Sequence, residues 1–300
     1  LGLSMEDAVK AADERVVSIP YLGVSRGRSE SLLLSSRGVS YSQQSNEVAA
    51  WCGPLLQDGD SRKSGMQVYH RRQWDPQAGK RIAEEAVEKA VELLKASPIS
   101  GGKLPVVLDE YMAPRFLGMF FGAFSAESAQ RGMSRLQGRL GETIAIPELT
   151  LLDDPHRQGA NRSCFLDAEG FLTKPLPLIE EGVFRNFLYH VESANKENKR
   201  STGHAVRGYS GGIGTRSHNL VWPTGEFSLE QLCAQNSKCL LVTQLEGQAG
   251  CNPVSGDISI GVQGFLIENG LRIQPVDSIT LAGNFFDVLL NIRGSGNTYQ

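Results

Sequence analysis

The sequence predicts an α+β fold, built mainly of antiparallel β-sheets with a few helices and divided into two domains. Short apolar stretches bounded by turn residues recur along most of the chain, which is typical of strands. Glycine is abundant, at 33 of 300 residues, and this favours many tight turns over a helical bundle. Ser97-Pro98 and the glycine-containing stretch after it end the first third of the chain. We therefore expect a smaller domain over residues 1–98 and a larger, β-rich domain over residues 99–300.

The smaller domain is expected to contain a short helix, a meander of strands and one amphipathic helix. The first helical pattern covers residues 5–15, and the strands follow within residues 21–73. Asp75-Pro76 is a strong helix start, because aspartate caps a helix well and proline fits its first position. Apolar residues then recur on one face, which predicts a helix over residues 76–96. The expected strands of the meander include residues 24–26, 31–35, 47–51 and 66–70.

The larger domain is expected to open with a buried strand over residues 105–108 and a helix over residues 114–126. The helix is apolar nearly all round, so it should be buried. Residues 199–217 are rich in glycine, serine and arginine and predict a long surface loop. Near the end of the chain, Asn269-Gly270 joins two apolar strands and predicts a tight type I′ hairpin turn. The remaining strands are expected at residues 149–152, 183–189, 239–245, 258–267, 271–276 and 278–282.

Composition and charge argue against several classes of function. The net charge is −3, from 30 basic and 33 acidic residues, and no basic run offers the electrostatic support that nucleic-acid binding needs. No stretch approaches the roughly 20 apolar residues of a membrane span, and no signal peptide is recognisable. The 5 cysteines lack paired short spacing, which argues against a disulfide framework. We therefore expect a cytoplasmic protein that binds neither nucleic acid nor membrane.

Two residues are candidate nucleophiles. Ser210 lies in residues 208–212 (GYSGG), which are close to the G-x-S-x-G pattern of a nucleophile elbow. That mechanism needs a strand before the serine and a helix after it, whereas a glycine-rich stretch follows here, so we favour a surface loop. Cys251 is the second candidate, but no basic neighbour in the sequence lowers the pKa of its thiol, which favours an unreactive turn cysteine.

The sequence gives little support for a catalytic pair of carboxylates or for a metal site. Asp257 and Glu268 are candidate paired carboxylates, yet Asp257 is better explained as a turn cap and Glu268 as a hairpin edge residue. Cys233 and Cys239 have no second pair that would complete a zinc site. The histidines are too far apart in the sequence for two to share a helical turn, at positions 70, 156, 190, 204 and 218. We therefore predict no catalytic, cofactor-binding or metal-binding residue in this chain.

Several short blocks lie in a specific order and spacing along the chain. They are residues 140–142 (LGE), 149–155 (LTLLDDP), 167–170 (DAEG), 179–183 (IEEGV), 187–188 (FL), 201–205 (STGHA), 252–257 (NPVSGD) and 278–286 (SITLAGNFF). Together they closely resemble the TldD/TldE (PmbA) family of peptide-processing metalloproteases, which have long been called modulators of DNA gyrase. The resemblance covers residues 104–296, and residues 5–96 resemble the family's middle domain. We find no counterpart of the family's N-terminal domain or of its extreme C-terminal end.

The resemblance implies one informative difference at residues 109–114. In TldD-type subunits an apolar strand runs into H-E-x-x-x-H, whose two histidines ligate zinc and whose glutamate activates water. Here Asp109 replaces the first histidine and Pro114 the second, while Glu110 keeps the position of the glutamate. The family's third ligand, a cysteine near its C-terminus, would fall beyond Gln300. The chain therefore resembles TldE/PmbA, the subunit that lacks the metal motif, and we interpret Glu110 as a leftover or a helix-start charge.

The resemblance implies an accessory subunit of a heterodimeric zinc metalloprotease that degrades or matures unfolded peptides. On this interpretation the chain holds no cofactor, the zinc belongs to a TldD-type catalytic partner, and no autonomous catalytic site is expected. Unfolded peptides are expected to bind as extended strands along a sheet edge. Two alternatives remain open: a homodimeric binding or structural module without a proteolytic role, and an independent hydrolase that uses Ser210 or Cys251.

Overall fold

The computed structural model describes residues 1–36, 38–247 and 249–298. Its described part contains seven helices and fourteen strands, with about 21% of residues in helices and 38% in strands. Most sheets are antiparallel, so the predicted α+β class is confirmed. The chain divides into two compact units, which are described separately below. Unit 1 comprises residues 1–98, 159–161 and 275–277, and unit 2 comprises residues 99–158, 162–274 and 278–300.

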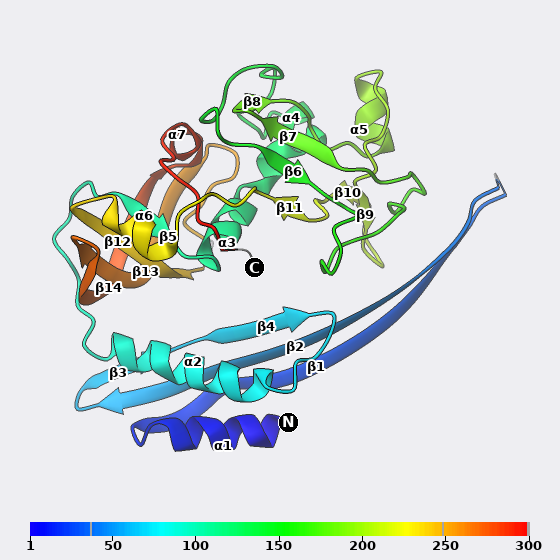
Figure 1. Ribbon diagram of the computed structural model, residues 1–300. Helices are drawn as coiled ribbons and strands as arrows, with labels where there is room; N and C mark the ends of the chain where they lie inside the picture. Colours follow the sequence, from blue (N-terminus) through cyan, green and yellow to red (C-terminus); the bar gives the residue numbers. More distant parts are fainter. Residues whose placement is uncertain (37, 248, 299–300) are drawn as a thin grey trace. The chain divides into compact units, whose positions relative to one another are not determined.

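Unit 1 is an antiparallel sheet with two helices packed beside it (Figure 1). The sheet has the order β1-β2-β3, and β4 also pairs with β2. Helices α1 and α2 contact each other, and α2 also packs on β2, β3 and β4. The elements of unit 1 are α1 (Gly2–Ala12), β1 (Val16–Leu34), β2 (Ser40–Asp58), β3 (Ser61–Ser64), β4 (Gln67–Arg71) and α2 (Ala78–Leu93).

The core of unit 1 lies between α2 and the sheet. Helix α2 buries a row of alanines, whose small side chains let the helix lie close to the strands. The closest approach is at Gly65, where an added Cβ would lie 2.1 Å from the carbonyl oxygen of Ala86. Helix α2 begins at Ala78 rather than at Pro76, and the carboxylate of Asp75 accepts a hydrogen bond from the backbone N–H of Gln77 at 2.9 Å. The buried cluster consists of Met5, Val9, Ala50, Cys52, Leu56, Ala78, Ile82, Ala83, Ala86, Val87, Ala90 and Leu94.

The predicted meander of short strands is wrong, because residues 16–58 form one long hairpin. Strands β1 and β2 have 19 residues each and pair along almost their full length, from Val16 opposite Leu56 to Leu34 opposite Ser40. The glycines that suggested turns lie inside β1. Gly23 faces Trp51, and a Cβ at Gly23 would lie 2.3 Å from the indole ring. These glycines therefore make room for cross-strand side chains and do not end a strand.

Unit 2 contains two four-stranded sheets and a short hairpin. The first sheet has the order β14-β13-β12-β5, in which only β5 runs parallel to its neighbour β12. The second has the order β11-β6-β7-β8, and β9 pairs with β10. The strands are β5 (Val106–Leu108), β6 (Leu151–Asp153), β7 (Leu176–Glu180), β8 (Val183–Phe184), β9 (Ala205–Arg207), β10 (Ile213–Thr215), β11 (Leu220–Val221), β12 (Lys238–Glu246), β13 (Asp257–Glu268) and β14 (Leu271–Asn284).

The turn between β13 and β14 is the one the sequence predicts. Asn269 has a φ of 50° and Gly270 a φ of 79°, which are the two positive values that a type I′ turn needs. The predicted hairpin is therefore confirmed, and it fixes the register of the longest strands of unit 2.

The predicted helix over residues 114–126 is instead three short segments. They are α3 (Met112–Met119), a 3₁₀ segment (Phe121–Phe124) and α4 (Ala126–Gln130). The chain leaves the helical conformation at Ser125, whose hydroxyl then accepts a hydrogen bond from the N–H of Ser128 and caps α4. Phe120 stacks on Phe285 with ring centroids 4.5 Å apart, so one face of the segment is buried as predicted. The prediction of burial all round is wrong, because Pro114, Arg115 and Gly118 are exposed. The remaining helices are α5 (Val191–Lys196), α6 (Leu229–Ala234) and α7 (Phe285–Leu290).

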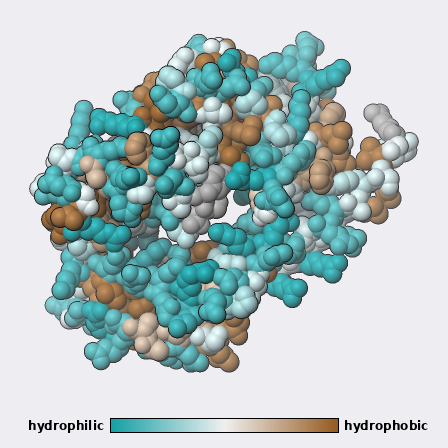
Figure 2. All heavy atoms as spheres, viewed as in Figure 1, coloured by the Kyte–Doolittle hydropathy of each residue, from teal (hydrophilic) through white to brown (hydrophobic). Residues whose placement is uncertain are grey.

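One face of the molecule is mostly polar. Figure 2 shows hydrophilic side chains over most of the visible face, with the hydrophobic ones in separate small groups. Among the described residues, no helix combines the length and the apolar character that crossing a bilayer requires.

Candidate functional site

The junction between β5 and α3 is the first candidate site. Strand β5 is an edge strand that pairs with β12, with Leu108 opposite Val242. One residue later, the backbone N–H of Asp109 still donates to the carbonyl oxygen of Val242 at 3.3 Å. The chain then leaves the sheet and enters α3 at Met112. This strand-to-helix turn therefore presents residues 109–114 at one end of the sheet.

Asp109 acts as a helix cap at this junction. Its Oδ1 atom accepts hydrogen bonds from the backbone N–H groups of Tyr111, at 3.0 Å, and of Met112, at 2.7 Å. The side chain is buried, and its negative charge lies at the positive end of the α3 dipole. Pro114 lies in the first turn of α3, where a missing N–H costs little. Both residues thus serve the start of the helix.

The residues at this junction do not fit a zinc ion. A catalytic zinc needs about three protein ligands of nitrogen, sulfur or carboxylate type. Pro114 offers no ligand atom at all, and Oδ1 of Asp109 already accepts two hydrogen bonds. The half-buried Glu110 is the other carboxylate among residues 109–114. The donor chemistry therefore gives no support to a metal-activated water at residues 109–114.

A second candidate is a buried cluster of Asp153, His204 and His218. Potential ligand atoms of these three residues all lie within 4.8 Å of one another, and all three side chains are buried. The Nε2 atom of His204 lies 2.7 Å from Oδ2 of Asp153, and the two imidazole rings have centroids 4.8 Å apart. Asp153 ends β6, whereas the histidines flank the β9–β10 hairpin. The fold thus brings together three segments that are distant in the sequence.

Hydrogen bonds define the protonation of His218. Its Nε2 donates to the carbonyl oxygen of Gly203 at 2.9 Å, and its Nδ1 lies 3.3 Å from Sγ of Cys164. Burial lowers the pKa of His218 below its ordinary value, which favours the neutral ring. Burial also raises the pKa of the Cys164 thiol, so Cys164 remains an S–H donor to Nδ1. The two side chains are therefore an un-ionised pair, and not an activated thiolate with an imidazolium.

The cluster is better explained as a hydrogen-bonded network than as a metal site. The Nε2 of His204 and the backbone N–H of His218 both contact Oδ2 of Asp153, the latter at 3.0 Å. Nδ1 of His204 lies 2.9 Å from Oγ1 of Thr202. Every ring nitrogen of His204 and His218 therefore has a partner, and Oδ1 of Asp153 is the one side-chain oxygen or nitrogen of these three residues that has no partner among the described residues. A cation would have to break several of these bonds, so we assign the cluster to the architecture of unit 2.

The network also corrects the prediction for residues 199–217, which are not one long surface loop. His204 and Ala205 are buried, and β9 and β10 form a hairpin within this range. The N–H of Thr202 donates to Tyr189 at 3.2 Å, and the N–H of Ala205 donates to the carboxylate of Asp167 at 3.1 Å. Spacing along the chain did not reveal the meeting of His204 and His218, because a hairpin separates them. Their positions on either side of a glycine-rich stretch were the one available signal.

The two candidate nucleophiles are not activated. Ser210 lies in the connection between β9 and β10, beside a fully exposed Tyr209, so a strand and not a helix follows it. The predicted surface loop is confirmed at this position. Cys251 is half-buried, and burial raises the pKa of its thiol above the ordinary value. At neutral pH it is therefore a thiol, which is a weak nucleophile.

The two candidate carboxylates do not form a pair. Asp257 and Glu268 are the first and last residues of β13, so the length of the strand separates them. Asp257 accepts hydrogen bonds from Oγ of Ser255 at 2.6 Å and from Nδ2 of Asn284 at 3.1 Å. Glu268 lies 2.8 Å from the ammonium of Lys238 on the neighbouring strand. These contacts explain Asp257 as a turn residue and Glu268 as a residue at the end of a strand.

Comparisons with known proteins agree with this architecture. The chain matches the model of the PmbA/TldA metallopeptidase central domain over residues 1–94 and that of the PmbA/TldA metallopeptidase C-terminal domain over residues 101–300. It is 30% identical to a metalloprotease PmbA homolog of Haemophilus influenzae, over 97% of this chain and 63% of that protein. It is also 30% identical to metalloprotease PmbA of Escherichia coli O157:H7, over 100% of this chain and 65% of that protein. The chain thus spans less than two thirds of the length of these relatives.

Solved structures show the same fold. A Thermotoga maritima protein that bears the provisional name of modulator of a DNA gyrase superposes with a TM-score of 0.90 at 29% identity, over 99% of this chain and 69% of that one. TldE from Thermococcus kodakarensis superposes with a TM-score of 0.83 at 26% identity, over 98% of this chain and 67% of that one. Since the two family models together match most of the sequence, the chain belongs to the PmbA/TldA (TldD/TldE) metallopeptidase family.

Proposed function

We propose that this chain is a TldE/PmbA-like accessory subunit of a heterodimeric zinc metalloprotease that degrades or matures unfolded peptides. The observation that carries the proposal is the strand-to-helix junction at residues 109–114. Asp109 is committed to capping α3, and Pro114 has no ligand atom. The chain therefore contributes no metal-activated water, and the zinc belongs to a TldD-type partner. The likeness to TldE supports this assignment.

The role of the chain in the complex is to hold and enclose peptide substrate. Strand β5 lies at the edge of its sheet and leads directly into the junction. An extended peptide can add to such an edge through backbone hydrogen bonds, which give affinity with little sequence preference. This mode favours unfolded chains, because most strands of a folded protein are already paired on both sides and the edges are protected.

An exposed surface on unit 1 supports assembly with another protein. Near the end of the β1–β2 hairpin, Leu32 is 65% exposed and Leu34 is 63% exposed. Both lie on the same face of β1, because alternate residues of a strand point to the same side. Exposed leucines beside a two-stranded ribbon suit burial against a partner subunit. We also place the protein in the cytoplasm, where free cysteines such as Cys52 and Cys233 remain reduced.

The decisive experiment compares the isolated chain with the reconstituted pair. The chain is purified alone and together with a TldD-type subunit that carries H-E-x-x-x-H, and each sample is given zinc and an unfolded peptide. We expect cleavage only by the pair, and stoichiometric zinc only in the partner. Stoichiometric zinc and peptide cleavage by the isolated chain would overturn the proposal.

Two variants separate the alternatives. Ser210→Ala and Cys251→Ser should leave cleavage by the pair unchanged, since neither residue is activated. A large loss with either variant would instead favour an independent hydrolase. Co-purification addresses the remaining alternative, because a chain that forms only homodimers and never captures a TldD-type subunit is a structural or binding module.

A further inference from the structure

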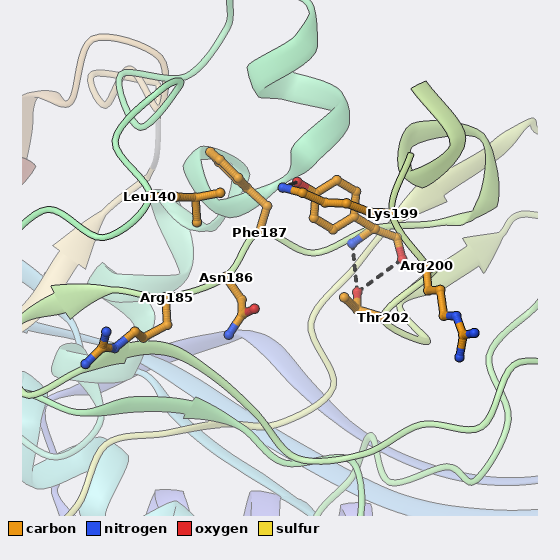
Figure 3. A pocket seen from close by; sticks show the side chains of 8 residues that line it. Leu140, Arg185, Asn186, Phe187, Lys199, Arg200 and Thr202 are labelled. Atoms are coloured by element: carbon orange, nitrogen blue, oxygen red, sulfur yellow. Dashed lines mark hydrogen bonds between the residues drawn. The ribbon is translucent and has the colours of Figure 1, made fainter. Parts of the chain in front are cut away.

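Unit 2 contains a surface cavity. Its volume is about 330 Å³, near the lower limit for small-ligand sites. It lies between residues 185–189, which follow β8, and residues 199–202, which follow α5. Figure 3 shows Arg185 and Arg200 on opposite sides, with Asn186 and Thr202 between them. The lining residues are Leu140, Arg185, Asn186, Phe187, Tyr189, Lys199, Arg200 and Thr202.

The lining is positively charged and contains no acidic residue. Two of its three cations are already compensated. Arg185 lies 3.0 Å from Glu180, and Lys199 lies 3.0 Å from Glu197 and 2.8 Å from the hydroxyl of Tyr189. Arg200 is exposed and has no hydrogen bond or ion pair within the described part of the chain. One positive charge is therefore left without a counter-charge at this cavity.

The remaining lining residues offer an apolar contact and a hydrogen-bond acceptor. Leu140 is 41% exposed and lies next to Phe187 (Figure 3). Nδ2 of Asn186 donates to the carbonyl oxygen of Pro177 at 2.8 Å, and Oδ1 of Asn186 has no hydrogen bond within the described residues. A ligand that suits this lining has one negative charge, an N–H donor close to it and an apolar group.

We propose that this cavity binds the C-terminal carboxylate of an unfolded peptide. The guanidinium of Arg200 pairs with the carboxylate, because its planar N–H groups match the two oxygens. Oδ1 of Asn186 accepts the N–H of a terminal residue, and the side chain of that residue rests on Leu140. A single uncompensated charge suits a carboxylate better than a doubly charged phosphate. The inference rests on the proposed function only for the choice of a peptide as the ligand.

Fluorescence polarisation of a labelled peptide with an apolar last residue tests the proposal on the isolated chain. The peptide is compared as the free acid and as the C-terminal amide. We expect the free acid to bind about tenfold more tightly, because a charge-assisted hydrogen bond adds about 1.5 kcal/mol or more. Equal affinity of acid and amide would overturn the proposal.

Arg200→Gln and Arg207→Gln form a matched pair of variants. Both remove one positive charge from an exposed arginine of unit 2, and Arg207 does not line the cavity. Arg200→Gln should weaken binding of the acid about tenfold and leave the amide unchanged, whereas Arg207→Gln should behave as the unmodified chain. An equal effect of the two variants would show a general charge effect and contradict the site.

Competition distinguishes a peptide terminus from a small organic acid. An unlabelled N-acetylated dipeptide acid should displace the labelled peptide, whereas acetate at the same concentration should not. Equal displacement by acetate would contradict the peptide assignment.

None of these measurements needs a TldD-type subunit. If the isolated chain does not bind the carboxylate but the pair with a TldD-type subunit cleaves peptides, only this inference is wrong. If the chain binds the carboxylate but does not capture a TldD-type subunit, only the proposed assembly is wrong.

Discussion

Oδ2 of Asp153 lies 2.7 Å from Nε2 of His204, and both side chains are completely shielded from solvent. The same oxygen accepts the backbone N–H of His218 at 3.0 Å. This carboxylate thus joins the end of β6 to both sides of the β9–β10 hairpin. A buried carboxylate that loses its side-chain donor is costly, because no water replaces the lost hydrogen bond.

Replacing His204 tests the contribution of this contact to stability. His204→Phe removes the donor and should lower the free energy of unfolding by about 3 kcal/mol. His204→Asn keeps an amide donor in place of the imidazole and should cost clearly less. Urea unfolding of the two variants and the unmodified chain measures the difference. Similar losses for Asn and Phe would show that packing, and not the hydrogen bond, accounts for the effect.

The lowered pKa of His218 predicts a pH dependence of stability. Burial lowers this pKa, and His204 and Arg216 act in the same direction, while Gly203 and Asp153 oppose them. In the unfolded chain the imidazole of His218 has its ordinary pKa of 6.5, and in the folded protein the ring binds a proton only at lower pH. Since the unfolded state then binds more protons, stability should fall as the pH drops below this value.

His218→Gln is the control for that pH dependence. The variant removes the titrating ring, so its free energy of unfolding should change less between about pH 7 and about pH 5 than that of the unmodified chain. Urea unfolding at both pH values provides the measurement. An unchanged slope in the variant would assign the pH dependence to other groups.

Replacing Asp109 tests its role as a cap for α3. Asp109→Ala removes the acceptor for the N–H groups of Tyr111 and Met112 and should cost about 1 kcal/mol of stability. Asp109→Ser retains an oxygen acceptor and should recover much of the loss. Thermal unfolding followed by circular dichroism compares the two. If Ala and Ser are equally stable, the hydrogen bonds to Asp109 do not stabilise the helix start.

The tight turn between β13 and β14 offers a test of backbone strain. Gly270 has a φ of 79°, and an added Cβ would lie 3.3 Å from Cβ of Ala234. Gly270→Ala should therefore destabilise the protein by about 1 kcal/mol. Gly283 in β14 is the control, since its added Cβ would meet open space and its φ is not positive. Equal losses for Gly270→Ala and Gly283→Ala would contradict the role of the turn.

Local signals in the sequence predicted the parts of the fold that local interactions determine. Asn269-Gly270 supplies the two positive φ values by itself, so the hairpin could be predicted. The apolar face of α2 could likewise be predicted from residues close together in the sequence, although the helix begins at Ala78 and not at Pro76. By contrast, the long β1–β2 hairpin could not be predicted, because the glycine at position 23 is explained by the ring of Trp51 on the opposite strand.

The candidate sites show the same limit. The difference at Asp109 and Pro114 is visible in the sequence, because the strand, the junction and the helix are consecutive. The hydrogen-bonded network is not visible, since Asp153, His204 and His218 come from three separate segments. The cavity beside Arg200 likewise combines residues after β8 with residues after α5. Sequence periodicity does not predict contacts between residues that lie in separate segments of the chain.

The parallel pairing of β5 with β12 has a consequence for how the protein is made. The partner of Val106 is Leu240, so β5 has no neighbour on this side until the ribosome has translated the intervening chain. At about 5 to 20 residues per second, this delay is on the order of 7 to 27 s. Throughout that interval β5 lacks its strand partner β12, and Phe120 lacks Phe285, on which it stacks. The junction at residues 109–114, which follows β5, therefore completes its pairing late in synthesis.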